Sequence, residues 1–301
     1  NTVMRDPTLF RIIETPHYRQ KDKYVAWPTY DFEVSIADSL TGVTHALRSK
    51  EYELRDELYY YIVEKCGLRK PLVYDFSRLN IRGTLLSKRF LKPLIVEKKV
   101  CGWDDPRLPT IKGLRRRGVC AQAIKNFVLS FGLSKVESEP SFSTLLTENK
   151  KLLEPHAKHY FFVRAPVELK ISGSPDGVQS VFIEKADAAA ISEGELFRLK
   201  NGFNVELSSK KPLAGKYAGT DLKESKKIHW VKKGAELNAT LLELGDLFVE
   251  DASSGEKVFN EKSLVRVKGV CQKACEEVKK SEVIQFERIG LAILDGVKKK
   301  E

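Results

Sequence analysis

The first 92 residues mix two patterns of apolar and polar positions. Runs of β-forming residues at 24–27 and 72–74 lie on either side of 51–65, a charged and apolar stretch that contains neither Gly nor Pro. Such runs predict strands, and the stretch between them predicts a helix. The order strand, helix, strand is typical of an open α/β sheet with right-handed crossovers, so residues 1–92 predict part of such a sheet.

The pattern becomes helical over 93–158. Apolar residues recur at helical spacing, and the runs are bounded by Pro, by Gly or by Ser141, whose hydroxyl suits an N-cap. These signals predict helices over 110–117, 121–131 and 142–153. We therefore expect a small helical domain in this part of the chain.

From about residue 159 onward the pattern is that of short strands. Runs rich in Val, Ile, Leu and Phe recur between turn residues, at intervals typical of all-β barrels or sandwiches. No repeat of fixed period accompanies them. The last part of the sequence therefore predicts an all-β region.

Composition sets broad limits on the kind of protein. A chain of 301 residues is too long for one ordinary core, which favours two or three domains. With 31% charged and 42% hydrophobic residues it fits a soluble folded protein. Because long uncharged apolar runs and a signal peptide are absent from the sequence, we expect no membrane segment. The net charge of +11 favours a polyanionic partner such as nucleic acid, although many basic proteins bind none.

The cysteines argue for a reducing, cytoplasmic compartment. They are five in number and scattered, which does not suit a disulfide framework. Cys271 and Cys275 are four residues apart, but a tetrahedral zinc site needs four ligands at workable spacing. We therefore predict ordinary thiols and no structural metal.

The run Ser87-Lys88-Arg89 places a hydroxyl, an ammonium and a guanidinium in one short loop after a strand-like segment. Preorganised cations of this kind stabilise negative charge that develops on a polyphosphate. Taken alone, the run is more commonly a solvated basic loop. The interpretation therefore depends on its context.

That context is a series of longer runs in a consistent order: 4–12, 27–32, 42–48, 74–80, 86–89, 102–110 and, more weakly, 285–290. The series resembles class I glutamyl-tRNA synthetases of the archaeal and eukaryotic type, over essentially the whole sequence. The resemblance implies a multi-domain α/β and β fold. It would contain the C-terminal half of a Rossmann-type catalytic domain over 1–92, a helical stem-contact domain over 93–158, and antiparallel β-barrels that form an anticodon-binding region over 159–301.

The resemblance also implies half of an ATP site. In the family, a loop of the KMSKS type contacts the ATP phosphates while the adenylate forms, and Ser87, Lys88 and Arg89 match that loop. Lys88 would be the catalytic residue that holds the phosphates of ATP, which binds with Mg²⁺. Leu85 and Leu86 would pack near the adenine.

An amino-acid site is implied further upstream. Tyr30 matches the family's substrate-binding tyrosine, and Val34 lies one helical turn later, where it could line the pocket. At the position of Arg48 the related glutaminyl enzymes carry a small neutral residue. A buried arginine binds a γ-carboxylate bidentately, whereas a neutral amide leaves its charge poorly paired, so Arg48 favours L-glutamate. The alternative is a structural ion pair of Arg48 with Glu51 or Glu53.

The expected tRNA surface is basic and extended. A dense cluster of cations is costly unless an anionic partner faces it, and in the family the helical domain lies against the inside of the tRNA. Arg55 would reach toward the acceptor stem, and the β-barrels would read the anticodon, although the sequence does not identify the residues that do so. The predicted phosphate contacts are Lys112, Arg115, Arg116 and Arg117.

The resemblance implies a glutamate–tRNA ligase, which joins L-glutamate to tRNA through an adenylate and releases AMP and pyrophosphate. Since no His-x-Gly-His run is present, we expect a fragment that lacks the HIGH-motif half, is inactive alone and retains mainly tRNA binding. Two alternatives stay open: a glutaminyl-tRNA synthetase, and a non-catalytic tRNA-binding module derived from a synthetase. We also expect a monomer.

Overall fold

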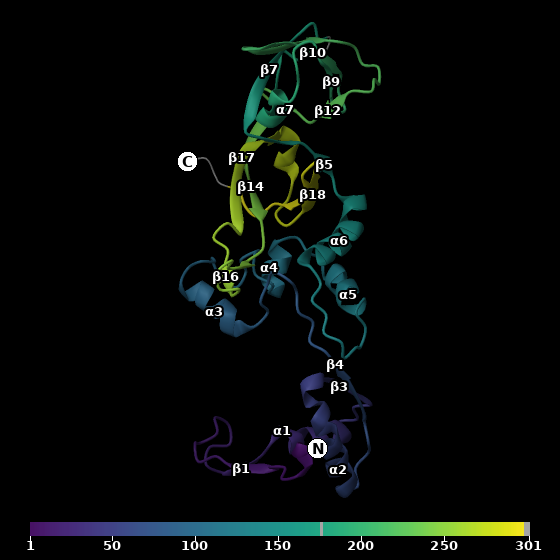
Figure 1. Ribbon diagram of the computed structural model, residues 1–301, viewed down its shortest axis with the longest axis vertical. Helices are drawn as coiled ribbons and strands as arrows, with labels where there is room; N and C mark the ends of the chain where they lie inside the picture. Colours follow the sequence, from purple (N-terminus) through teal and green to yellow (C-terminus); the bar gives the residue numbers. More distant parts are fainter. Residues whose placement is uncertain (175–176, 298–301) are drawn as a thin grey trace. The chain divides into compact units, whose positions relative to one another are not determined.

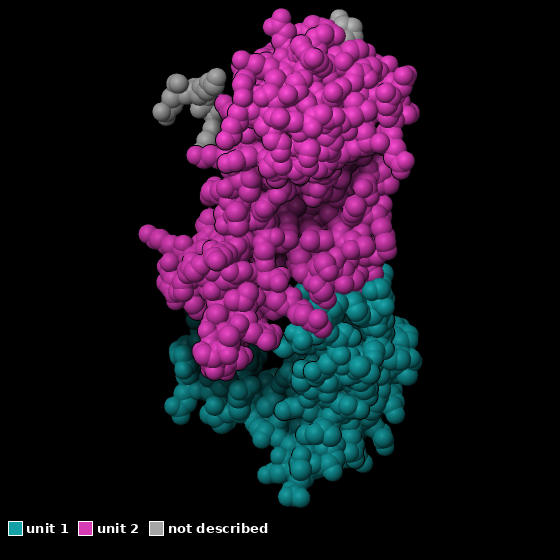
Figure 2. All heavy atoms as spheres, turned by 45° about the horizontal axis from the view of Figure 1, so that its top comes forward, with its two compact units in different colours: residues 1–81, 128–140 teal, residues 82–127, 141–301 magenta. Residues whose placement is uncertain are grey.

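The computed structural model describes residues 1–174 and 177–297, which form two compact units. Figure 2 shows the two units in different colours. Unit 1 comprises residues 1–81 and 128–140, and unit 2 comprises residues 82–127 and 141–301. Each unit is described by itself. No helix in the described part of the chain is both long and apolar enough to cross a membrane.

Unit 1 contains the strand predicted at 72–74, which is β4, and the run predicted at 24–27 overlaps β2. The strand that precedes the helix is β3, which was not predicted. Strands β3 and β4 are parallel, with Arg48 opposite Asp75, and β1 pairs antiparallel with β2 (Figure 1). The elements of unit 1 are η1 (Thr2–Met4), β1 (Phe10–Ile12), β2 (Ala26–Pro28), α1 (Tyr30–Leu40), β3 (His45–Ser49), η2 (Lys50–Arg55), α2 (Asp56–Lys65) and β4 (Leu72–Phe76).

The helix predicted over 51–65 is correct only for its second part. The first part forms the 3₁₀ helix η2, and the α-helix starts at Asp56, where acidic residues occupy the first turn. Negative side chains at this end interact favourably with the helix macrodipole. Leu58 and Ile62, four residues apart on one face of α2, are buried.

The sheet formed by β3 and β4 leaves large apolar side chains exposed. Leu47 is 57% exposed, Leu72 53% and Tyr74 48%. Parallel sheets occur almost only where both faces are covered, because their strands are apolar on both sides. The pair therefore has the residue pattern of strands from a larger, covered sheet.

Residues 128–140 belong to unit 1 although the chain has by then entered unit 2. The backbone N–H of Ser77 donates to the carbonyl of Ser134 at 2.7 Å, and that of Asn80 donates to the carbonyl of Ser138 at 3.2 Å. We call residues 128–140 the return segment. Because this segment pairs with residues far back in the sequence, the compact units do not coincide with the three predicted domains, whose boundaries stay predictions.

The helical region confirms the three predicted helices. The Thr110 hydroxyl accepts a hydrogen bond from the N–H of Gly113 at 2.9 Å, and the Ser141 hydroxyl accepts one from the N–H of Ser143 at 3.3 Å, so both act as N-caps. The helices of this region are α3 (Lys88–Val96), α4 (Ile111–Arg116), α5 (Ala121–Leu129), α6 (Phe142–Leu153) and η3 (Glu154–His156).

The prediction that Lys88 and Arg89 lie in a loop is wrong. Ser87 is the N-cap residue of α3, and the two cations occupy the first turn of this helix. The helix forms because Leu91 and Leu94, one turn apart, are buried together on one face. The loop therefore ends at Ser87, two residues before the sequence motif does.

The last part of the chain is rich in strands, as predicted. It also contains the short helices α7 (Lys185–Ala189) and η4 (Lys273–Glu277). The strands are β5 (His159–Tyr160), β6 (Phe162–Arg164), β7 (Pro166–Ser172), β8 (Ser180–Glu184), β9 (Leu196–Leu199), β10 (Asn204–Lys210), β11 (Leu213–Tyr217), β12 (Lys226–Ile228), β13 (Val231–Lys232), β14 (Glu236–Leu244), β15 (Phe248–Glu250), β16 (Lys257–Phe259), β17 (Leu264–Gln272), β18 (Val283–Phe286) and β19 (Gly290–Ile293).

The expectation of purely antiparallel barrels is wrong. The largest sheet has the strand order β12-β9-β10-β11-β7-β8-β13, in which β11 pairs parallel with β7 and β12 pairs parallel with β9. In the C-terminal sheet β18 also pairs parallel with β5. Parallel neighbours need a crossover connection rather than a tight turn, and the strand pattern of a sequence does not distinguish the two directions.

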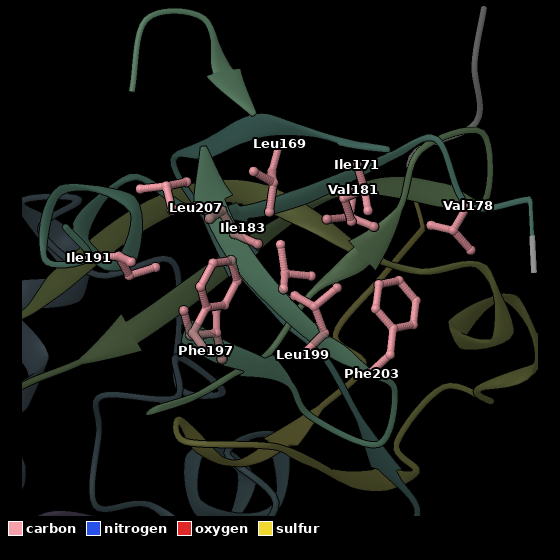
Figure 3. Close-up of a cluster of buried hydrophobic side chains, with 12 residues drawn as sticks. Leu169, Ile171, Val178, Val181, Ile183, Ile191, Phe197, Leu199, Phe203 and Leu207 are labelled. Carbon is pink, nitrogen blue, oxygen red and sulfur yellow. The ribbon is translucent and has the colours of Figure 1, made fainter. Parts of the chain in front are cut away.

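The seven-stranded sheet is built around one apolar core, which Figure 3 shows with side chains from several strands converging. Phe197, Leu199 and Val205 are fully buried there. Gly215 on β11 is required by this packing, because a Cβ atom at that position would lie 2.5 Å from Cγ1 of Val205. The close approach of β10 and β11 therefore depends on a residue without a side chain.

A separate apolar cluster joins α3 to the hairpin β15–β16, which lie side by side in Figure 1. Leu91 and Leu94 of α3 pack with Leu247 and Phe248 of the hairpin. The helix that carries Lys88 is thus anchored on the β region through contacts between residues far apart in sequence.

Candidate functional site

Arg48 lies inside unit 1 on β3, with 7% of its surface exposed. Its guanidinium stacks 4.3 Å above the ring centroid of Tyr59, and Nη1 is 3.8 Å from Oδ1 of Asp56. The alternative prediction, an ion pair of Arg48 with Glu51 or Glu53, is therefore wrong, because the acidic partner of Arg48 is Asp56. Among the described residues, Nη2 of Arg48 has no hydrogen-bond partner. A buried guanidinium with an unpaired N–H₂ group can donate hydrogen bonds to a carboxylate ligand.

Tyr30 and Val34 lie one turn apart on α1, in the same unit as Arg48. Tyr30 is half exposed, and its ring centroid is 5.4 Å from that of Tyr52. Val34 is partly buried. That these side chains line one pocket with Arg48 stays a prediction.

Arg55 has a partner within unit 1. It forms an ion pair with Asp31 on α1, and its guanidinium lies 5.8 Å from the ring centroid of Tyr52. The Arg55 side chain is nevertheless 43% exposed. Its predicted role at an acceptor stem therefore stays a prediction, and any such contact would compete with the ion pair to Asp31.

The start of α3 is an exposed cationic surface. Ser87, Lys88 and Arg89 are all exposed, while Leu85 packs beneath them against the apolar cluster of α3 and Leu86 is 43% exposed. Two cations at a helix N-terminus repel the positive end of the macrodipole, and a bound anion relieves that repulsion. An open hollow on this helix is lined by Lys88, Arg89, Lys92, Pro93, Val96 and Glu97.

The run at 102–110 is a structural turn built around Asp105, which is 2% exposed. Arg107 donates to both oxygens of Asp105 at 2.9 Å and to the hydroxyl of Ser263 at 3.2 Å. Burial alone would raise the pKa of Asp105, but the hydrogen bonds from Arg107 and from the N–H of Cys101 outweigh burial and lower it. This fully paired arginine joins the helical region to the β region.

The predicted cation cluster on α4 separates into exposed and engaged side chains. Lys112 and Arg115 are exposed. Arg116 instead donates to both oxygens of Asp295, at 2.6 and 2.8 Å, and to Asp104 at 3.3 Å. Asp295 lies 179 residues away in sequence, so no local pattern indicates this pair.

Arg117 is also engaged within unit 2. Its guanidinium lies 4.5 Å from the ring centroid of Phe142. Burial lowers the pKa of Arg117, partly offset by the charge of Asp246. Of the four predicted phosphate contacts, the structure therefore leaves Lys112 and Arg115 exposed and gives Arg116 and Arg117 partners of their own.

The β region contains a small polar pocket of about 150 Å³ that sequence reasoning missed. Glu287 accepts hydrogen bonds at the pocket from His159 at 2.8 Å and from Lys200 at 2.6 Å, and these hydrogen bonds lower its pKa. The Trp230 indole N–H donates to the Lys200 carbonyl at 3.0 Å. The lining residues are His159, Phe161, Lys200, Asn201, Trp230, Gln272 and Glu287. They come from segments so distant in sequence that no motif could have signalled the pocket.

Beside this pocket, Arg288 joins two parts of the β region. It donates to both oxygens of Asp187 at 2.7 and 3.1 Å, and its Nη1 is 3.1 Å from Nδ1 of His229. His229 is 1% exposed, and burial lowers its pKa. These contacts stabilise the fold of the β region, while the Arg288 side chain is 43% exposed.

The cysteines are all free thiols. In the part of the chain that the structure describes, no group of three or more His, Cys, Asp or Glu side chains could hold a metal ion.

Comparisons with known proteins agree with the geometry. Residues 1–154 match the family model of tRNA synthetases class I (E and Q), catalytic domain, and residues 227–295 match that of the anti-codon binding domain of the same synthetases. Trp230, Gln272 and Glu287 of the polar pocket lie within the second match.

Among curated proteins, the chain is 38% identical over 317 residues to the glutamate–tRNA ligase of Nitrosopumilus maritimus, covering 98% of this chain and 55% of that protein. It is 36% identical over 310 residues to that of Cenarchaeum symbiosum, covering 96% and 54%. To the probable cytoplasmic glutamate–tRNA ligase of Encephalitozoon cuniculi it is 35% identical over 329 residues, covering 98% and 51%. The chain spans about half the length of the curated relatives it matches.

The chain belongs to the family of class I (E and Q) tRNA synthetases. The family resemblance inferred from the runs of sequence is thereby confirmed.

Proposed function

We propose that this chain is part of a glutamate–tRNA ligase. It supplies the arginine that binds the side-chain carboxylate of glutamate, residues that contact the ATP phosphates, and the surface that binds tRNA. The observation that carries the proposal is Arg48, which is buried and has an unpaired Nη2. Leaving a buried charge without a partner costs several kcal/mol, so a ligand carboxylate has more to gain here than a neutral amide. The glutamate–tRNA ligases among the relatives support the same substrate.

The start of α3 would bind the ATP phosphates. Lys88 and Arg89 project from the first turn, where a phosphate is attracted both by their charges and by the helix N-terminus. Lys88 would hold the phosphates during adenylate formation, with Ser87 and Arg89 beside it and Mg²⁺ supplied with ATP. These residues act by position and charge, because amino-acid activation needs no covalent bond to the protein.

The tRNA would lie on α4 and on the β region. Lys112 and Arg115 are the exposed cations of α4 and would contact phosphates. The polar pocket has the chemistry to receive one unstacked base of the anticodon. Trp230 and Phe161 offer aromatic surface, while Lys200 and Glu287 offer a donor and acceptors for base edges. We place the ligase in the cytoplasm, as the name of the Encephalitozoon relative indicates for that protein.

Amino-acid-dependent exchange between ATP and pyrophosphate tests the substrate in the ligase that contains this chain. We expect exchange with L-glutamate and a loss of at least about a hundredfold with L-glutamine, because a missing charge partner costs about 3 kcal/mol. Arg48→Gln should reverse or abolish the preference. Exchange that depends on glutamine would instead support a glutaminyl enzyme.

Binding of tRNA by the 301-residue chain tests the proposed tRNA surface. Replacing Lys200 by Met should weaken binding to glutamate tRNA and should have little effect once the anticodon bases are changed. Binding without any glutamate-dependent exchange by the ligase would favour the non-catalytic tRNA-binding module.

A further inference from the structure

Arg48 belongs to a charged cluster larger than the proposed function requires. Asp75 lies opposite Arg48 on β4, and its side chain is 4% exposed. The Asp56 side chain, at the start of α2, is 23% exposed. Lys135 of the return segment places Nζ 3.7 Å from Oδ2 of Asp75 and 2.6 Å from Oε1 of Glu53. We call these five side chains the Arg48 cluster.

Within the Arg48 cluster, Asp56 and Asp75 lie beside the same buried arginine: Asp56 is 3.8 Å from Arg48, and Asp75 is opposite Arg48 in the strand register. The pKa of Asp56 is raised from 3.8 to about 6 by burial first, and then by the hydrogen bond to Asp75 and by its charge, while Arg48 and Lys135 lower it. Oδ1 of each aspartate has no hydrogen-bond partner in the described part of the protein. A neighbouring carboxylate and little surrounding water both disfavour the charged form of Asp56.

Two further residues near the cluster, Tyr59 and Arg55, are already engaged with other carboxylates. Tyr59, which stacks on Arg48, donates its hydroxyl hydrogen to Oδ2 of Asp38 at 3.2 Å. Burial, followed by the charge of Asp38, raises the pKa of Tyr59 to about 12, so the phenol is neutral. Arg55, the last residue of η2, is already paired with Asp31.

Charge within the Arg48 cluster is therefore balanced only when one proton is shared. Arg48 and Lys135 carry two positive charges, whereas Asp56, Asp75 and Glu53 carry up to three negative ones. A ligand carboxylate on Nη2 of Arg48 would add a further negative charge within reach of Asp56. Only uptake of a proton removes the resulting repulsion.

We propose that Asp56, together with Asp75, is the element that positions and neutralises Arg48 without ligand, and that this pair takes up one proton from solvent when a ligand carboxylate binds Arg48. Asp56 is then a specificity-determining residue, because a neutral amide would not drive the proton uptake. The inference rests on the proposed function of Arg48 as the residue that binds the side-chain carboxylate of glutamate.

The affinity of Arg48 for a carboxylate ligand should depend on pH in one direction. Lower pH favours the protonated pair and so favours the carboxylate ligand, whereas higher pH leaves Asp56 ionised as a competitor for Arg48. Linkage of one proton to binding changes the affinity by up to about tenfold for each pH unit. The apparent affinity for L-glutamate should therefore weaken as the pH rises from about 6.5 to about 8.5, while that for L-glutamine should not.

The test measures KM for L-glutamate in ATP–pyrophosphate exchange by the ligase across this pH range. For the unaltered protein we expect KM to rise with pH. In Asp56→Asn the rise should disappear, and at pH 8 the KM should be several-fold lower than in the unaltered protein. Glu53→Gln is the matched control, since Glu53 also belongs to the Arg48 cluster but is 53% exposed, and the pH dependence should persist in it.

Two results would overturn the inference. One is a pH-independent KM in the unaltered protein. The other is Asp56→Asn with a higher KM at every pH and the original pH dependence, which would make Asp56 a structural support only. Neither result touches the proposed function, which fails separately if the unaltered ligase shows no glutamate-dependent exchange.

Titration of the side-chain carboxyl carbons by NMR in the 301-residue chain provides a readout that needs no activity. Asp56 should titrate well above an ordinary aspartate, and Asp75→Asn should return it toward the ordinary range. An ordinary titration of Asp56 in the unaltered chain would also overturn the inference.

Discussion

Two buried arginines, one in each unit, are paired in opposite ways. Arg107 in unit 2 donates to both oxygens of Asp105 at 2.9 Å and also to Ser263, whereas Arg48 in unit 1 is 3.8 Å from Asp56 and keeps an unpaired Nη2. A buried arginine with complete hydrogen bonds stabilises the fold, and one without them is poised for a ligand. We therefore propose that the pairing state, rather than burial, distinguishes a structural arginine from one that binds a ligand.

Among the substitutions that test this comparison, the largest effect should be on the stability of unit 2. Asp105→Ala leaves Arg107 buried without its partner, which should lower the free energy of unfolding by about 3–5 kcal/mol. Denaturant unfolding of the 301-residue chain, followed by a probe in unit 2, measures this loss. If Asp105→Ala were as stable as the unaltered chain, pairing would not separate the two arginines.

The same pair predicts an acid dependence. The pKa of Asp105 is lowered below its usual 3.8, so its stabilising contribution is complete above about pH 4 and is lost as the pH falls further. The acid-induced loss should be smaller in Asp105→Ala.

The second effect is on catalysis. Arg48→Gln should reduce kcat/KM for L-glutamate by about a hundredfold or more, because removal of a buried charge partner costs about 3 kcal/mol of ligand binding. The free energy of unfolding of the 301-residue chain should fall by less than in Asp105→Ala, since Arg48 makes only a loose pair with Asp56 and keeps an unpaired Nη2. Equal loss of stability in Arg48→Gln and Asp105→Ala would remove the distinction.

The third effect concerns the stability of unit 1 as a function of pH. Because the pKa of Asp56 is raised to about 6, the folded chain holds a proton that the unfolded chain releases above about pH 4. Stability should therefore fall between about pH 4 and pH 6 and then level off, by up to about 3 kcal/mol. Asp56→Asn should lack this fall, which thermal unfolding at a series of pH values would reveal.

The smallest effect compares two neighbouring arginines on α4. Arg115→Ala should weaken tRNA binding about tenfold and reduce the salt slope by about 0.9, the value for one phosphate contact. Arg116→Ala should keep the salt slope and lower stability instead, since Arg116 is held by Asp295. Binding measured over a series of salt concentrations separates the two. Equal salt slopes in the two variants would show that the exposure of an arginine side chain does not identify it as a phosphate contact.

Much of the local structure could be predicted from the sequence. The helix at Phe142–Leu153 begins after Ser141 as expected, and the strand predicted at 72–74 is β4, although its parallel partner β3 was not predicted. These features depend on neighbours within a few residues, where capping and periodicity act. The helical start at Lys88 was missed because it depends on Leu91 and Leu94 packing against a hairpin more than a hundred residues away.

The sequence by itself determined the family, since the ordered runs over residues 1–130 resemble it and the matches over 1–154 and 227–295 confirm it. It also indicated Arg48 as the residue that selects the acid. Only the tertiary structure decided the partner of each charge: Asp56 rather than Glu51 or Glu53 for Arg48, and Asp295 rather than a phosphate for Arg116. The physical reason is that Coulomb and hydrogen-bond partners are set by distance in space and by burial, and residues of equal charge look alike in a sequence.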